Sequence, residues 1–478
     1  MLDGMIRVFL AEVLFPLTAL ITAGFLTRRL GTEGYGLLTV AATLVVGIEL
    51  AITSFFSRTT IKLVSEAHDW QPVGATVLRL QLLVSSAVAL LLCFLATPIA
   101  ALFNEPLVGQ YLRLFAFDIP LFSLASAHRD ILVGIGGFRQ RALIGAGRWI
   151  TRLLLIVLLV ELGLSVTGAI LGSIGASLVE LMIGRFYVRP SLFVRSLFPA
   201  RRLCDHAGLL FLSALSLNAF NRLDLLALKM LNGTAAEAGI YGAAQNLATL
   251  PGLVAISFSP LLLSTLSHVL RAADVVLAKQ MARNAMRIVV GLAPFAAMVA
   301  GAAPEIVSIV FGPAFRPAAP LLSVLIFGAL AQVMISISMT ILIAADKPGW
   351  TLVLTAPLVP LAVAGHLLMI PWLGAKGASL VTVFLASLVA LAAIVAVYRV
   401  WRVLPSLGTL LKSIVVCGLA YTLAVVWPAP GALLFSKLPV IAVFIGLSYL
   451  LLGEFSHSEI RLLLALLRWR TVPKEAAP

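Results

Sequence analysis

Several ionisable side chains lie inside long apolar stretches of the sequence, where they could bind a charged molecule. Four of them are arginines: Arg129, Arg148, Arg152 and Arg222. Arg148 and Arg152 are four residues apart, so on a helix they project from one face. Like charges on adjacent turns repel each other unless an anion or water meets them, and a guanidinium pairs well with phosphate oxygens. These arginines therefore predict an anion-binding path. The alternative for Arg148 and Arg152 is that their side chains only extend to lipid phosphates at the membrane surface.

Acidic side chains in similar stretches form a second group of candidates, which comprises Glu12, Glu49, Asp118 and Asp224. Asp118 shares a helical stripe with Arg129, about three turns away. The acids could balance the arginines in an empty cavity, or they could bind a coupling proton or sodium ion. Simple ion pairing with a neighbouring arginine is the alternative that we favour.

No motif in the sequence calls for a cofactor or a metal. The three cysteines, Cys93, Cys204 and Cys417, are far apart, so neither a disulfide framework nor a zinc site is indicated. A phosphate-binding glycine loop of the GxxxxGK[ST] kind is missing, which argues against ATP hydrolysis. His128 could titrate near neutral pH, although a lone histidine is more often a structural hydrogen-bonding residue.

The elements that carry these residues are membrane helices. The chain has 478 residues, of which 61% are hydrophobic and only 11% are charged, against about 25% charged in soluble domains. A membrane-spanning helix needs about 20 mainly apolar residues, so we expect an all-α polytopic membrane protein. The apolar runs predict fourteen transmembrane helices, at 8–27, 36–56, 80–103, 111–134, 142–162, 164–184, 207–228, 238–262, 286–310, 318–344, 350–371, 377–398, 409–427 and 432–453.

The basic residues predict which side of the membrane each end occupies. With fourteen spans, 23 of the 34 lysines and arginines fall on the side of the termini and six fall on the opposite side. Cytoplasmic loops carry the excess of Lys and Arg, so both termini are expected in the cytoplasm. The segment Met1–Arg7 is expected to lead into a retained first helix and not to be a signal peptide. The segment Glu459–Arg470 is expected to lie on the membrane as an amphipathic helix.

The second half of the sequence repeats features of the first half. Tyr35-Gly36 matches Tyr241-Gly242 at a spacing of 206 residues, and Gly168-Ala169 matches Gly377-Ala378 at 209. An even number of duplicated helices predicts two parallel six-helix lobes that face a central cleft and rock to expose it to alternate sides. We expect the Tyr-Gly steps to be tight turns in which glycine accepts a positive φ.

The repeat also predicts the division of the chain. We expect an N-terminal six-helix lobe at 1–200, a C-terminal six-helix lobe at 201–402, two additional transmembrane helices at 403–455 and the amphipathic cytoplasmic tail at 456–478. Prolines inside the predicted helices are expected to kink them, at Pro16, Pro120, Pro251, Pro294 and Pro357.

Together these motifs resemble those of the polysaccharide transporter and O-antigen flippase family, a branch of the large flippase superfamily that contains the MATE exporters. The resemblance covers about residues 5–400. It rests on the arginine–leucine–glycine–x–x–x–tyrosine–glycine pattern at Arg29–Gly36, on Gly239–Gly242, on Asp224 and on the glycine–alanine openings of the sixth and twelfth spans.

The resemblance implies a function and its partners. Such a protein would flip an undecaprenyl-pyrophosphate-linked oligosaccharide across the bacterial inner membrane for O-antigen, capsule or exopolysaccharide synthesis. The four arginines would form the pyrophosphate path, and Gln245 and Asn246 would contact sugar hydroxyls or, alternatively, link helices. The expected partners are membrane lipid, the lipid-linked glycan, a coupling proton or sodium ion, a polysaccharide polymerase and a chain-length regulator. Nucleic acid is not expected.

Three other functions compete with this interpretation. A lipid II flippase would share the fold and the number of spans. A MATE-type drug exporter would need exposed acids with few opposing arginines. The four arginines above and Arg113, which also falls within a predicted span, disfavour it. An enzyme would need a catalytic surface on a sizeable loop or domain, and the predicted external loops of about ten residues or fewer leave no room for it. We therefore expect no enzymatic activity.

Overall fold

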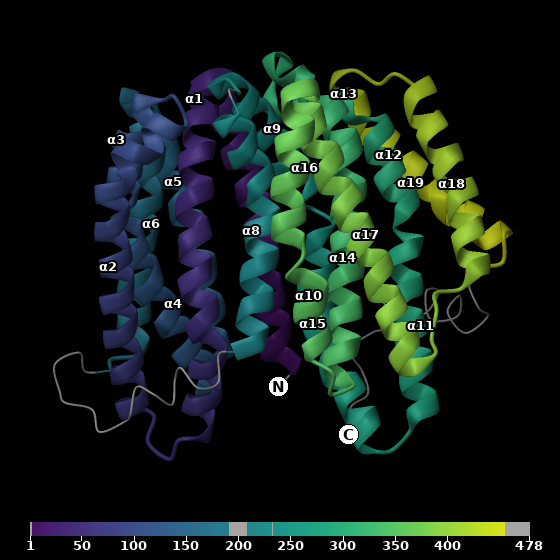
Figure 1. Ribbon diagram of the computed structural model, residues 1–478, viewed down its shortest axis with the longest axis horizontal. Coiled ribbons are helices and arrows are strands. Elements are labelled where there is room, and N and C mark those ends of the chain that lie inside the picture. Colours follow the sequence, from purple (N-terminus) through teal and green to yellow (C-terminus); the bar gives the residue numbers. More distant parts are fainter. Residues whose placement is uncertain (1, 191–207, 232, 455–478) are drawn as a thin grey trace, which may run out of the picture.

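A computed structural model describes residues 2–190, 208–231 and 233–454 of the chain, and in this part of the sequence every regular element is a helix. The helices stand side by side in one bundle (Figure 1). Ten of the described helical segments are long and apolar enough to cross a membrane. Two of these ten are 51 and 50 residues long, so each can cross twice.

The first helix group, α1–α6, lies on the left of Figure 1. Its members pack mainly on one another, with α5 on α6 and α1 on both α4 and α5. The helices are α1 (Leu2–Glu66), α2 (Gln71–Leu102), α3 (Pro106–Phe115), α4 (Asp118–Gly134), α5 (Phe138–Leu159) and α6 (Ser165–Tyr187). A tight turn at Val160–Leu164, with Gly163 at a φ of 91°, joins α5 to α6.

The second helix group, α8–α17, is centred on α14, which packs against α17, α10 and α12. Its helices are α8 (Gly208–Met230), α9 (Ala235–Ala248), α10 (Gly252–Arg271), α11 (Val275–Gly291), α12 (Ala293–Gly301), α13 (Ala303–Phe311), α14 (Ala319–Ala344), α15 (Gly349–Thr355), α16 (Leu358–Leu373) and α17 (Ala375–Trp401). The short helix Pro313–Ala318 precedes α14. Two further helices, α18 (Leu407–Val426) and α19 (Leu434–Leu451), pack on α12.

Bends and breaks occur at the residues that favour them. The predicted first and second spans are the two arms of α1, which are separated by a kink at Gly31, where φ is 67° and the backbone is not helical. Pro251 and Pro357 are the N-cap residues of α10 and α16, and Pro294 lies in the first turn of α12. Proline lacks the backbone N–H that a helix interior needs, so it is tolerated at these starts. Pro120 likewise lies in the first turn of α4. The chain therefore starts new helices at these four prolines and is not kinked within continuous helices, whereas Pro16 lies inside α1.

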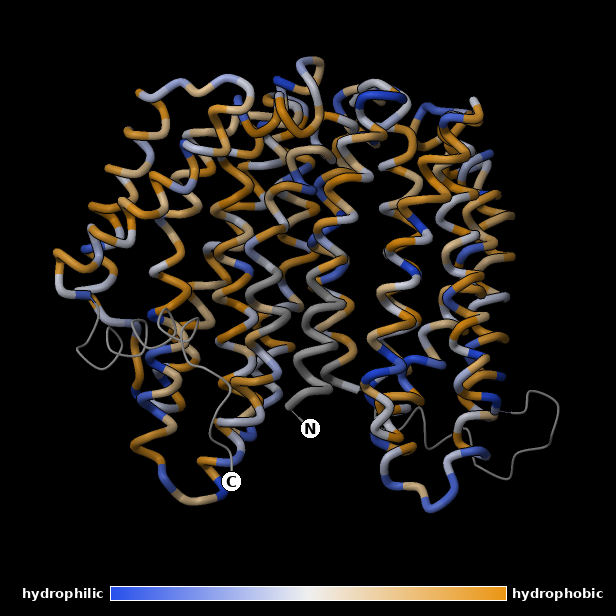
Figure 2. Tube along the Cα trace, turned by 180° about the vertical axis from the view of Figure 1, so that it is seen from behind, coloured by the Kyte–Doolittle hydropathy of each residue, from blue (hydrophilic) through white to orange (hydrophobic). Residues whose placement is uncertain are grey.

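Large hydrophobic side chains cover the outside of the bundle, as expected when lipid is the solvent. Phe94 is 79% exposed and Trp372 is 88% exposed. Figure 2 shows hydrophobic residues along the shafts of the helices and hydrophilic residues at the loops, with some hydrophilic residues midway along the bundle. These interior polar positions are the ones that need partners.

The two repeated Tyr-Gly motifs meet at the upper end of the bundle in Figure 1, where α1 packs on α9. A Cβ added to Gly36 would lie 1.7 Å from the carbonyl oxygen of Ala235, and one added to Gly239 would lie 2.2 Å from that of Thr32. Neither Gly36 nor Gly242 has a positive φ. The prediction of tight turns was therefore wrong: glycine is needed here because two helix backbones touch.

Further contacts join the two helix groups at this end. Lys229 Nζ on α8 lies 3.0 Å from Glu105 Oε1, which precedes α3. The amide nitrogen of Asn246 donates to the hydroxyl of Tyr35 over 2.7 Å. The ring of Tyr35 also packs edge-on against Phe315, with 5.7 Å between the centroids. The upper end therefore forms a closed contact between the groups.

The additional helices are fastened at their other end by Glu454, which follows α19. Its carboxylate accepts hydrogen bonds from Arg287 Nε on α11 over 2.7 Å and from Lys412 Nζ on α18 over 3.2 Å, and also from the hydroxyl of Thr409. Burial raises the pKa of Glu454, but these hydrogen bonds outweigh burial and leave the pKa below its ordinary value of 4.5. The ionised carboxylate therefore stabilises the fold.

We predict that Gly36→Ala lowers the thermal unfolding temperature in detergent, because the new methyl group meets the backbone of Ala235. Overpacking of this kind costs about 1–3 kcal/mol. Gly145→Ala is the matched control, since a Cβ there meets nothing within 4 Å and alanine is the better helix former. The control should leave the unfolding temperature unchanged or raise it. Equal effects of the two substitutions would contradict the close contact.

We predict that Glu454→Gln destabilises the protein in a pH-dependent way. A lowered carboxyl pKa gives stability that is present above the unfolded-state pKa and is lost as the pH falls through the folded-state pKa. The difference in unfolding temperature between wild type and variant should therefore be largest near about pH 7 and should shrink below about pH 4. A difference that stays constant over this range would show that the charge of Glu454 is unimportant.

Candidate functional site

Glu180 on α6 is the centre of an interior charge cluster. Its side chain is fully buried, and its two carboxylate oxygens face two different arginines. Arg129 Nη1 on α4 lies 2.7 Å from Oε1, and Arg148 Nε on α5 lies 3.3 Å from Oε2. A buried charge needs a partner, and Glu180 supplies one for both guanidinium groups.

The ring of Phe122 on α4 lies close to the guanidinium groups of the same two arginines. The guanidinium carbon of Arg148 is 4.3 Å from the ring centroid, and that of Arg129 is 5.4 Å from it. An aromatic face attracts a cation electrostatically, so Phe122 adds to the effect of Glu180. Asp118, on the same stripe of α4, makes no ion pair among the described residues. Arg129 therefore pairs with Glu180 and not with the acid on its own stripe.

Arg152 and Arg222 differ from this pair, because no carboxylate of the described residues lies within ion-pair distance of either. Arg152 Nε on α5 donates to Ser173 Oγ on α6 over 3.4 Å. Arg222 Nη1 on α8 donates to the carbonyl oxygen of Thr43 on α1 over 3.3 Å. Its aliphatic stem crosses Gly47, where an added Cβ would lie 3.1 Å from Cδ. Arg222 thus reaches from the second helix group to the first.

Glu49 on α1 lies within electrostatic range of both sets of arginines. It is 3% exposed, and it interacts with Asp118, Arg148, Arg152 and Arg222. In the described part of the chain, neither Glu49 nor Asp118 forms an ion pair. One carboxylate oxygen of each is also buried without a hydrogen-bond partner. The favoured prediction that each acid simply pairs with a neighbouring arginine is therefore wrong for these two residues.

Asp224 on α8 is bound by neutral donors. It accepts hydrogen bonds from the hydroxyl of Tyr241 over 2.8 Å, from Gln245 Nε2 over 3.0 Å and from the hydroxyl of Thr382 over 3.3 Å. These contacts tie α8 to α9 and α17 within the second helix group. The ion-pair prediction is also wrong for Asp224, while the side-chain nitrogen of Gln245 is already engaged in linking helices.

The remaining predicted residues have mixed outcomes. Asn246 is exposed, and its amide donates to the hydroxyl of Tyr35. His128 is 2% exposed, and its Nδ1 lies 2.8 Å from the carbonyl oxygen of Leu124, which is a structural role. Glu12 lies outside the residues whose side chains the structure describes.

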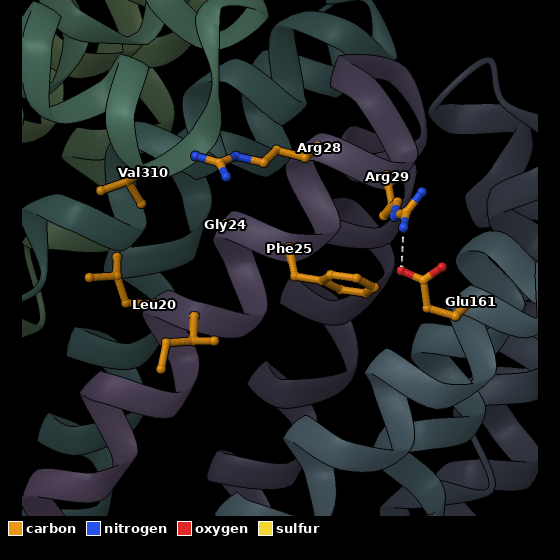
Figure 3. Close-up of a pocket in the computed structure, with 8 residues that line it drawn as sticks. Leu20, Gly24, Phe25, Arg28, Arg29, Glu161 and Val310 are labelled. Carbon is orange, nitrogen blue, oxygen red and sulfur yellow. Dashed lines mark hydrogen bonds and ion pairs between the residues drawn. The ribbon is translucent and has the colours of Figure 1, made fainter. Parts of the chain in front are cut away.

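A groove of about 550 Å³ lies at the upper end, beside the first part of α1 (Figure 3). Leu20, Ile21, Gly24, Phe25, Arg28, Arg29, Glu161 and Val310 line it. Arg29 Nη2 lies 2.5 Å from Glu161 Oε1, next to the turn between α5 and α6. Arg28 Nη2 donates to the carbonyl oxygen of Ile309 on α13 over 2.5 Å. Arg29 therefore links α1 to the turn between α5 and α6, and Arg28 links α1 to α13 in the second helix group.

Sequence reasoning gave Glu180 no role in the site, although the sequence contained a signal for one. Arg148 comes 15 residues before Gly163 and Glu180 comes 17 residues after it. In an antiparallel helix hairpin that turns at Gly163, such residues lie at similar heights and can meet. The same arithmetic pairs Arg152 with Ser173, as observed. Recognising the turn would have identified both contacts.

Residues 1–263 match the model of the polysaccharide biosynthesis protein family. The match covers more than half of the 478 residues, so the chain belongs to this family. No curated protein matches the sequence. The predicted family resemblance is thereby confirmed.

Solved structures of transporters share the fold. The lipid II flippase MurJ in an inward closed conformation has a TM-score of 0.72 at 14% identity, with 95% of this chain and 98% of that chain covered. An inward-facing multidrug resistance transporter of the MATE family in the MOP superfamily has a TM-score of 0.67 at 13% identity, with 87% and 99% covered. A MOP superfamily transporter from Pyrococcus furiosus has a TM-score of 0.61 at 14% identity, with 83% and 94% covered.

These similarities confirm the predicted all-α, MATE-like membrane fold. The family identifies the chain as a polysaccharide biosynthesis protein, and the fold is that of a multi-pass membrane protein.

We predict that Glu180→Gln destabilises the protein strongly, because it leaves two buried guanidinium groups without their carboxylate. Removing one partner of a buried ion pair costs about 3–5 kcal/mol, which a thermal unfolding assay in detergent would detect. Adding Arg148→Met should restore part of the loss, since one unpaired charge is then removed. Glu66→Gln is the control, because Glu66 is exposed and lies 4.0 Å from Lys62. Equal losses for Glu180→Gln and Glu66→Gln would contradict the central position of Glu180.

Proposed function

We propose that this transporter flips a polyprenyl-pyrophosphate-linked oligosaccharide across the bacterial inner membrane for the synthesis of a surface polysaccharide, by alternating access. The observation that carries the proposal is the interior set of arginines, two of which have no carboxylate partner among the described residues. A pyrophosphate is the ligand class whose charge and geometry suit several guanidinium groups. The membership of the family supports the polysaccharide as cargo.

Arg152 and Arg222 are the first residues that we assign to the pyrophosphate. Each is partly buried and is held by a neutral oxygen, so an anion would replace a weak partner with a strong one. Arg129 and Arg148 can join only if the pyrophosphate competes with Glu180. The pyrophosphate would thus meet Arg152 and Arg222 first, and Arg129 and Arg148 second. Glu180 would balance the charge of Arg129 and Arg148 when no pyrophosphate is bound there.

Glu49 and Asp118 are the acids that we assign to charge balance and to a coupling proton or sodium ion. Both are 3% exposed, and neither forms an ion pair within the described residues. Glu49 is affected by the charges of Arg148, Arg152 and Arg222, so occupancy by an anion would change its surroundings directly. Asp224 is less suited to such a role because three side-chain donors already hold it. The side-chain amide of Asn246 already donates to the hydroxyl of Tyr35, so a sugar would have to compete with that link between helices.

The two six-helix lobes, 1–200 and 201–402, would move against each other. Both termini would be cytoplasmic, as the distribution of Lys and Arg predicts, so the upper end in Figure 1 would face the periplasm. Release on that side would require α1 to separate from α9, with loss of the contact at Gly36 and of the Lys229–Glu105 ion pair. The cargo's polyprenyl tail would stay in lipid throughout.

We predict that Arg152→Ala combined with Arg222→Ala abolishes surface polysaccharide in a deletion strain, because the pyrophosphate loses both free cations. Undecaprenyl-linked oligosaccharide should accumulate in the cytoplasmic leaflet. Arg152→Lys with Arg222→Lys should retain part of the polymer, since the charge remains but bidentate pairing is lost. Arg113→Ala is the control, because Arg113 is exposed and donates to Thr97 Oγ1.

The same experiment contains the result that would overturn the proposal. Normal polymer in the double alanine variant, with the protein present at the wild-type level in the membrane, would exclude these arginines from the path. Accumulation of lipid II in the deletion strain would identify a peptidoglycan precursor as the cargo. Intact polymer with no lipid-linked intermediate in the deletion strain would exclude flipping altogether.

A further inference from the structure

A second groove, of about 530 Å³, lies between α2, α4 and α6 near the lower end of the first helix group. Its walls are largely apolar, and its polar residues are one histidine and two arginines. Leu78, Leu124, His128, Leu181, Met182, Arg185, Phe186 and Arg189 line it. None of the residues assigned to the pyrophosphate path contributes to this lining.

The groove opens on the outside of the bundle at the height where α6 ends. Met182 is 63% exposed and Phe186 is 70% exposed, and the helix stops at Tyr187. The rings of Phe186 and Tyr187 pack edge to face with 5.5 Å between their centroids. Exposed aromatic rings at a helix end are typical of the membrane–water boundary. The apolar wall therefore faces acyl chains, while Arg185 and Arg189 lie at headgroup height.

The charged side chains that line the groove are all positive. No acidic residue lines it, and in the described part of the chain no carboxylate lies within ion-pair distance of Arg185 or Arg189. Arg185 Nη1 donates to the carbonyl oxygen of Pro190 over 2.7 Å, which orients the guanidinium at the mouth of the groove. An anion is the partner that this arrangement lacks.

We propose that this groove binds an anionic phospholipid of the cytoplasmic leaflet, with its phosphate against Arg185 and Arg189 and one acyl chain along Leu181 and Met182. The apolar walls favour a lipid over a soluble phosphate, because a soluble anion would leave them in contact with water. The cytoplasmic leaflet supplies anionic headgroups, and basic pockets between membrane helices bind them. The site is separate from the cargo path, although its placement in that leaflet rests on the orientation proposed above.

Binding there would stabilise the contact between α4 and α6. Gly184 lets these helices approach closely, since an added Cβ would lie 3.0 Å from Cβ of His128. His128 precedes Arg129, and Glu180 is four residues before Gly184, so the same helix segments carry the Arg129–Glu180 ion pair. A lipid that contacts the outer faces of both α4 and α6 would therefore stabilise the packing that keeps the Arg129–Glu180 ion pair formed.

Native mass spectrometry of the purified full-length protein tests the proposal. Delipidated wild type is titrated with phosphatidylglycerol and, separately, with zwitterionic phosphatidylcholine of the same acyl chains. We expect phosphatidylglycerol to bind about ten-fold more tightly and to raise the thermal unfolding temperature, and Arg185→Ala with Arg189→Ala to remove this preference. Lys279→Ala with Arg283→Ala is the matched control, because it removes two exposed cations from α11 and should leave the preference intact.

Three results would overturn the proposal. Equal affinity of wild type for the two lipids excludes an anionic headgroup site, and equal losses in the two double alanine variants indicate general attraction to surface charge. Stabilisation by soluble glycerol phosphate as large as that by phosphatidylglycerol excludes a lipid occupant. Arg185→Lys with Arg189→Lys keeps both charges and should retain most of the preference, so the test holds even if the alanine variant fails to fold. None of these results bears on whether the protein carries a lipid-linked glycan.

Discussion

The cost of an unpaired charge in a membrane is the constraint on which this structure depends. Arg129, Arg148 and Glu180 lie on three different helices, and Glu180 lies within ion-pair distance of both arginines. That arrangement fixes how α4, α5 and α6 pack. It also leaves one net positive charge in the triad, with Arg152 and Arg222 nearby. Glu49 and Asp118 are buried in the same interior, so the cluster combines charges of both signs.

Close backbone contact has the corresponding role between the two helix groups. Gly36 and Gly239 allow α1 and α9 to touch at the upper end, and the polar contacts of Tyr35 and Lys229 surround that point. The same interface is also apolar, because one hydrophobic core runs from α1 into α8, α9 and α13. The polar links are therefore set within an apolar contact between the two helix groups.

Much of this could be predicted from the sequence, because hydropathy and breaker residues act locally. The membrane fold, the break at Pro251 and the inward-facing arginines followed from composition and periodicity. The partner of Arg129 did not follow, because it depends on how α4 packs against α6 in three dimensions. Tyr35-Gly36 was also misread, since a glycine that permits a turn and one that permits helix contact have the same one-letter code. Asp224 was expected to meet an arginine and instead meets neutral donors on two neighbouring helices.

The tight turn at Gly163 also governs how the chain can enter the bilayer during synthesis. A helix carrying Arg148 and Arg152 partitions poorly into lipid by itself, and so does one carrying Glu180. Because only five residues separate α5 from α6, the two can leave the translocon as a single hairpin in which Glu180 already pairs with Arg148. Assembly of the anion path would then begin at the ribosome, before the second half of the protein has been made.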